Sequence, residues 1–190
     1  MDLSDRTRTL IIRGSAIAIL GLAVVAALLP LPTRLPDRLV IGGLLSLAGL
    51  IECIAVYARR GRHLFAWLAG ATALVAGLRL ALDPWTNYFT VFNLVILWLV
   101  VRSAMLGLSA RGTKAPLCNW IWAAAAVDFL LALLLLVGLP IAVLVYGIFG
   151  QTSQLVATFA WILAASFAAS GALLLVAAPL ESGDEDQASG

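Results

Sequence analysis

The chain has 190 residues, of which 63% are hydrophobic and only 12% carry a charge, and its mean hydropathy is +1.05. This composition excludes a soluble globular domain. The net charge of +2 comes without a basic stripe of interleaved aromatic residues, so no nucleic acid is expected as a partner. The sequence predicts an integral membrane protein whose surroundings are the lipid bilayer.

Six apolar segments are each long enough to cross the hydrocarbon core, which takes roughly 20 residues of helix. They cover residues 10–29, 39–58, 64–82, 89–108, 120–139 and 155–178. We expect an all-α transmembrane domain over residues 1–180, built from three helical hairpins at 10–58, 64–108 and 120–178. An acidic, disordered tail is expected at residues 181–190.

A pair of small residues seven positions apart recurs in the first helix of each hairpin, which favours a threefold repeat. The pairs are Gly14 and Gly21, Gly70 and Gly77, and Ala125 and Ala132. Small residues also line faces of single helices, and such faces predict close packing between helices in a bilayer. These faces carry Gly14, Ala18 and Gly21; Ala69, Ala73, Gly77 and Ala81; and Ser166 and Ser170.

The third hairpin contains an insertion, residues 141–151, between its two helices. The preceding helix is expected to end before Pro140. The insertion is apolar but too short to span the membrane, so we expect it to lie on the outer surface or to dip into it. Two interpretations stay open: the segment covers an opening at the centre of the bundle, or it is a cap that faces lipid.

The basic residues are distributed unevenly over the connections between segments. One side has Arg6, Arg8, Arg13, Arg59, Arg60, Arg62, Arg111 and Lys114, and the other has only Arg34 and Arg38. Because positively charged residues concentrate on the cytoplasmic side, both termini are expected in the cytoplasm.

Charged side chains at bilayer depth either reach the surface, form pairs or serve a pathway. Glu52, Arg102 and Asp128 lie at similar depth on three helices, and we expect an intramembrane polar network of these residues with Arg13 nearby. The network could fix the register of the helices. It could instead respond to protons, with Asp128 as the carboxyl group that takes one up, because fewer cations are expected near it. Contacts to a partner or to lipid headgroups are the third possibility.

No catalytic, cofactor-binding or metal-binding pattern stands out in the sequence. The single histidine, His63, excludes a haem held by two histidines of this chain, and no nucleophile has a partner base at a recognisable spacing. We therefore expect a protein that is not an enzyme and that needs no cofactor or metal.

Three stretches resemble the HdeD-like acid-resistance membrane proteins of bacteria. They are Arg13–Gly14 at the start of the first helix, GLIECIAVYARR at the end of the second, and WLAGATALVAGLRLALDPW across the third. The third hairpin departs from the pattern, because it has alanines for both glycines and carries the insertion. The resemblance implies a multi-pass protein of the bacterial inner (cytoplasmic) membrane linked to survival in acid, with no catalytic residues to carry over.

The leading hypothesis is a non-enzymatic inner-membrane protein of the HdeD-like type, which acts in acid or envelope stress through packing or partner contacts. One alternative is a small transporter or channel for protons or small solutes. Another is an accessory subunit of a larger membrane complex. A homo-oligomer is compatible with each of these hypotheses.

Overall fold

The computed structural model describes residues 5–29, 38–59, 64–82, 88–111, 113, 115–149 and 153–182. Every regular element in these ranges is a helix, which confirms the predicted all-α class. The helices are α1 (Asp5–Leu28), α2 (Arg38–Ala58), α3 (Leu64–Leu82), α4 (Tyr88–Ala110), α5 (Leu117–Phe149) and α6 (Ser153–Ser182). Each of the six contains a stretch that is long and apolar enough to cross a membrane. Most of the predicted tail, residues 183–190, lies outside the described residues.

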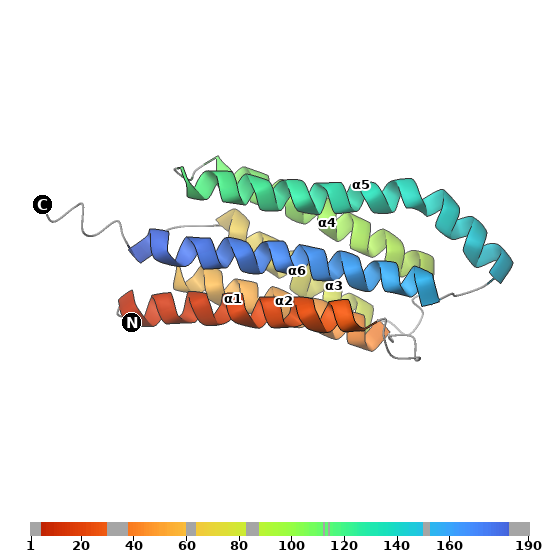
Figure 1. Cartoon of the computed structure of the whole chain (residues 1–190), viewed down its shortest axis with the longest axis horizontal. Coiled ribbons are helices and arrows are strands. Elements are labelled where there is room, and N and C mark those ends of the chain that lie inside the picture. Colours follow the sequence, from red (N-terminus) through yellow and green to blue (C-terminus); the bar gives the residue numbers. More distant parts are fainter. Residues whose placement is uncertain are drawn as a thin grey trace, which may run out of the picture.

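The helices form a closed ring, because each packs against its neighbours in sequence and α6 packs against α1 (Figure 1). Extensive contacts, within α2–α3, α4–α5 and α6–α1, alternate with smaller ones within α1–α2, α3–α4 and α5–α6. Three predicted hairpins arranged around a ring would give such an alternation. In that arrangement the smaller contacts lie within each hairpin, and the most extensive contacts join neighbouring hairpins.

All six helices run along one common direction, up and down in turn (Figure 1). The end of the bundle at which α1 begins is called the amino end below. Helices α2, α4 and α6 finish at the amino end, and α3 and α5 start there. Residues far apart in sequence therefore share a depth in the bundle when they lie equally far from these helix ends.

Large apolar side chains cover the outside of the bundle. Ile17, Val75 and Val137 are each about two-thirds exposed, at 66%, 65% and 67%. So many exposed large apolar side chains are unusual on a soluble monomer. Together with the six apolar helices, they identify a multi-pass membrane protein.

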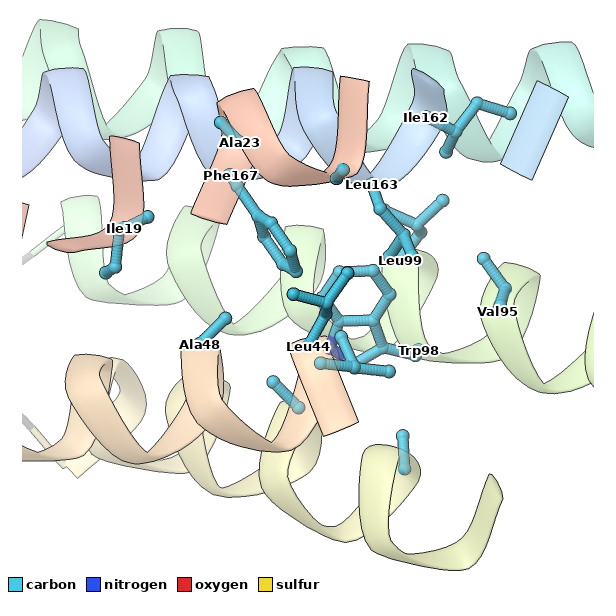
Figure 2. Packing of buried hydrophobic residues seen from close by; sticks show 14 of the residues in the cluster. Ile19, Ala23, Leu44, Ala48, Val95, Trp98, Leu99, Ile162, Leu163 and Phe167 are labelled. Carbon is cyan, nitrogen blue, oxygen red and sulfur yellow. The ribbon is translucent and has the colours of Figure 1, made fainter. Parts of the chain in front are cut away.

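The inside of the ring is filled by side chains. Figure 2 shows Leu44, Trp98 and Phe167 pointing into the same space between α2, α4 and α6. Leu99 and Leu163, both fully buried, extend this cluster along α4 and α6. The centre of the bundle is thus a packed apolar core over much of its length.

Glycine allows the closest helix contact, which joins α2 to α3. A Cβ atom added at Gly77 would lie 2.5 Å from the backbone nitrogen of Ser46 and 2.7 Å from the carbonyl oxygen of Gly42. One at Gly42 would lie 2.8 Å from the carbonyl oxygen of Gly77. These distances are too short for any side chain, so the small-residue face predicted on α3 packs directly against backbone of α2.

The corresponding face of α1 is not packed, and the expectation for it was wrong. Gly14, Ala18 and Gly21 are exposed, and a Cβ atom at either glycine would meet nothing within 4 Å. The buried face of α1 instead consists of Ile12, Ala16, Ile19, Ala23 and Ala26. That set follows the three-and-four spacing of one helix face, and it places the glycines on the opposite side.

Helix α5 does not end before Pro140, as the sequence had suggested. It continues through this proline to Phe149 and has 33 residues, which corresponds to about 50 Å of helix. Figure 1 shows its last part turned away from the direction of the first part. Residues 141–149 of the predicted insertion therefore extend α5. Proline is tolerated inside membrane helices but bends them, because it removes one backbone hydrogen bond.

Candidate functional site

Arg102 of α4 lies at the centre of a buried charge cluster. Its Nη1 atom donates to Asp128 Oδ2 of α5 at 2.6 Å, and its Nη2 atom donates to Glu52 Oε1 of α2 at 2.5 Å. Only 3% of Arg102 and 1% of Asp128 is exposed, whereas the side chain of Glu52 is 12% exposed. One guanidinium group therefore joins carboxylates from two other helices.

Two serines of α6 complete the cluster. Arg102 Nη1 also donates to Ser166 Oγ at 3.0 Å, and Nη2 donates to Ser170 Oγ at 2.7 Å. Ser166 Oγ donates in turn to Asp128 Oδ1 at 2.7 Å, and Ser170 Oγ donates to the carbonyl oxygen of Ser166 at 2.8 Å. The cluster thus connects α2, α4, α5 and α6. We call Glu52, Arg102, Asp128, Ser166 and Ser170 the Arg102 cluster.

An aromatic ring borders the guanidinium group as well. The Cζ atom of Arg102 lies 5.7 Å from the centre of the Trp98 ring, one helical turn earlier on α4. This distance is within the range of a cation–π interaction. Trp98 is 3% exposed and belongs to the apolar core, so the cluster and the core meet at this residue.

The charges of the cluster do not balance when both carboxyl groups are ionised. Arg102 supplies one positive charge, and Glu52 and Asp128 supply two negative charges. Burying a charge without full compensation is expensive, so the cluster favours the uptake of one positive charge. A proton on either carboxyl group would make it neutral.

The structure brings together three of the four residues predicted for the polar network. Glu52, Arg102 and Asp128 are in direct contact. Arg13 is exposed on α1 and takes no part in the contacts of the cluster. Asp128 and Glu52 share the guanidinium group of Arg102, and Arg59 lines the cavity beside Glu52, so the expectation that fewer cations lie near Asp128 stays a prediction.

Ser166 and Ser170 were expected to serve only as small residues at a helix contact. Their hydroxyl groups accept hydrogen bonds from Arg102, so they are polar members of the site. Their spacing of four residues on α6, at the depth of Arg102, was the available signal. A buried guanidinium group has five N–H donors, and two carboxylates on separate helices do not satisfy all of them.

A partly enclosed cavity of about 40 Å³ lies beside the cluster. Its lining residues come from α2 with the residue that follows it, α3, α4 and α6. They are Glu52, Val56, Arg59, Ala66, Ala69, Arg102, Leu106, Ser170, Leu173 and Leu174. Asp128 is not among them. Since a water molecule needs roughly 10–15 Å³ of such space, the cavity can hold a few waters beside Glu52.

Within the described part of the chain, no group of three or more His, Cys, Asp or Glu side chains is arranged to hold a metal ion. Comparison with models of protein families found no match, and comparisons with curated proteins and with solved structures found none either.

Proposed function

We propose that this chain is a non-enzymatic, acid-responsive membrane protein of the HdeD-like type, in which the Arg102 cluster responds to protons. The observation that carries the proposal is the excess negative charge of a buried cluster with two carboxylates and one guanidinium group. In the proposed setting the protein lies in a bacterial inner membrane with both termini in the cytoplasm. The resemblance noted in the sequence adds the link to acid stress.

The cluster couples protonation to packing because its members lie on four helices. Neutralising one carboxyl group weakens its attraction to Arg102 and frees hydrogen-bonding capacity of the guanidinium group. Protonation therefore changes the stability of the present packing of α2, α4, α5 and α6. The proposed output of the protein is such a change in packing, which acts on the bilayer or on a partner.

Single neutral substitutions test this proposal, because each imitates one protonated form. Glu52→Gln and Asp128→Asn each leave one carboxylate opposite Arg102, so each variant lacks the excess negative charge of the cluster. In a bacterial strain without its own copy, we expect the unsubstituted chain to raise survival of an acid challenge. Both variants should lose an order of magnitude or more of that benefit at equal amounts of protein in the membrane.

Arg13→Gln is the matched control, since it also removes one charge from a membrane helix but lies outside the cluster. It should survive acid as the unsubstituted chain does. Normal survival with both Glu52→Gln and Asp128→Asn would refute the role of the cluster, and so would an equal loss with Arg13→Gln.

A further inference from the structure

The cavity extends from the Arg102 cluster toward the amino end along each of the elements that line it. On α2, Glu52 and Val56 lead toward its end at Ala58, and Arg59 follows directly. On α4 and α6, the lining residues Leu106 and Leu174 lie closer to the amino end than Arg102 and Ser170 do. Glu52 lies six residues from the end of α2, which corresponds to about 9 Å. The lining of the cavity thus extends from the cluster toward that end.

The two carboxylates of the cluster differ in whether they border the cavity. Glu52 lines it and is 12% exposed, whereas Asp128 lies on the far side of Arg102 and is 1% exposed. Both oxygens of Asp128 accept hydrogen bonds, from Arg102 and from Ser166. For Glu52, the hydrogen bond from Arg102 engages Oε1. Glu52 is therefore the carboxyl group of the cluster that borders the cavity.

The charged and polar groups that line the cavity with Glu52 come from the elements packed around it. The ionisable residues that line the cavity are Arg59, which follows α2, and Arg102 of α4. Helix α3 contributes Ala66 and Ala69, and α6 contributes Ser170 besides leucines. The thiol of Cys53 is directed toward α3, since a Cβ atom at Gly70 would lie 3.0 Å from its Sγ atom. Among the described residues, Glu52 is the carboxylate that lines the cavity.

We infer that this cavity is a water-filled entry from the amino end of the bundle and that Glu52 is the residue that exchanges protons through it. The proton comes from a hydronium ion in the cavity and bonds to the Glu52 carboxylate, which leaves a water molecule behind. Arg102 keeps its proton throughout. Asp128 keeps its hydrogen bond from Arg102 and so holds the guanidinium group in place. This inference deepens the proposed function and rests on it.

Cysteine accessibility tests the entry. In a chain with Cys53→Ala and Cys118→Ala, single cysteines are placed at the cavity by Val56→Cys and Leu173→Cys, and in the dry core by Leu99→Cys. Ag⁺, an ion close in size to a water molecule, is added to membrane vesicles of known orientation. We expect the two cavity cysteines to react faster than the core cysteine by an order of magnitude, from the amino-end side only. Equal rates at all three positions would overturn the inference, and so would reaction from the opposite side.

Trp98 fluorescence tests which carboxyl group takes up the proton, because the ring lies against Arg102. Trp98 is kept and the other tryptophans are replaced by phenylalanine, namely Trp67, Trp85, Trp120, Trp122 and Trp161. We expect a fluorescence transition on acidification that Glu52→Gln abolishes and that Asp128→Asn shifts but retains. A transition that persists in the Glu52→Gln protein would overturn the inference but not the proposed function. The absence of any transition in the chain with both carboxylates would overturn the inference and the proposed function together.

Discussion

Arg102 donates hydrogen bonds to side chains of three other helices, and the shape of its side chain makes this possible. Each terminal nitrogen serves one carboxylate and one serine, so the planar group is held from four directions. Lysine has the same charge but a single terminal nitrogen, which cannot reach both sides of the cluster. The geometry of the guanidinium group, and not its charge alone, holds the four helices together.

Arg102→Lys should therefore destabilise the bundle although it conserves the charge. The substitution removes at least one charge-assisted hydrogen bond and leaves its acceptor buried, so we expect the free energy of unfolding to fall by about 2–3 kcal/mol. Denaturant unfolding in detergent micelles, followed by circular dichroism, measures this difference. Arg13→Lys is the control and should unfold at the same denaturant concentration as the unsubstituted chain. Equal stability of the two variants would contradict the role assigned to Arg102.

For single residues, the depth of each charge within its predicted membrane span was enough to predict three members of the cluster but not its full composition. Glu52, Arg102 and Asp128 could be selected because charges deep in a membrane helix need partners. Depth does not determine how a helix is rotated about its axis, and for that reason Arg13 was wrongly placed nearby. Ser166 and Ser170 were not predicted as hydrogen-bonding partners of Arg102. A serine in a membrane helix suits a close helix contact by its small size and a polar site by its hydroxyl group, and the sequence does not distinguish the two roles.

Among the elements, α1 and α3 carry the same glycine pair but use it differently. Gly77 of α3 lies against the backbone of α2, and Gly14 and Gly21 of α1 face outward. The glycine pattern alone could not distinguish these cases. The apolar residues of α1 could not distinguish them either, because its buried face has Ile12 and Ile19 and its exposed face has Ile17 and Val24.

This contrast allows a matched pair of substitutions. Gly77→Ala forces α2 and α3 apart, and we expect it to lower the free energy of unfolding by about 1–3 kcal/mol. Gly14→Ala meets open space and replaces glycine in a helix, so it should be neutral or stabilising by up to about 1 kcal/mol. Thermal unfolding in detergent compares the two. A Gly77→Ala protein as stable as the Gly14→Ala protein would show that the contact of α2 with α3 is not as close as described.

In the whole molecule, the helix count and the membrane class could be predicted, but the packing partners could not. Six apolar segments of sufficient length indicate six spans, and the structure has six helices at these places. The sequence suggested hairpins of consecutive helices. The most extensive contacts lie between hairpins, and the contact of α6 with α1 closes the ring. Apolar patterning does not identify partners, since lipid is as apolar as a neighbouring helix.

A split chain tests the closure of the ring. Without α6, α1 loses the helix that covers Ala16 and Leu20, and Arg102 loses both serine acceptors. A chain of residues 1–150 should accumulate poorly in the membrane, and co-expression of residues 151–190 should restore it by association. Pull-down of an epitope on the shorter piece measures this association. Stable accumulation of residues 1–150 alone, with the protease resistance of the full chain, would contradict the prediction.

The contact between α1 and α6 also has a consequence for biosynthesis. Helix α1 is synthesised well before α6, the helix that covers its buried face, which ends about 150 residues later. At roughly 5–20 residues per second, α1 waits on the order of 10–30 s for its partner. During that time its buried face of alanines and isoleucines is open to lipid, to the insertion machinery or to another nascent chain. The exposed Gly14 face is not covered by this chain before or after the ring closes, so the unfinished and the finished chain differ on the other side of α1.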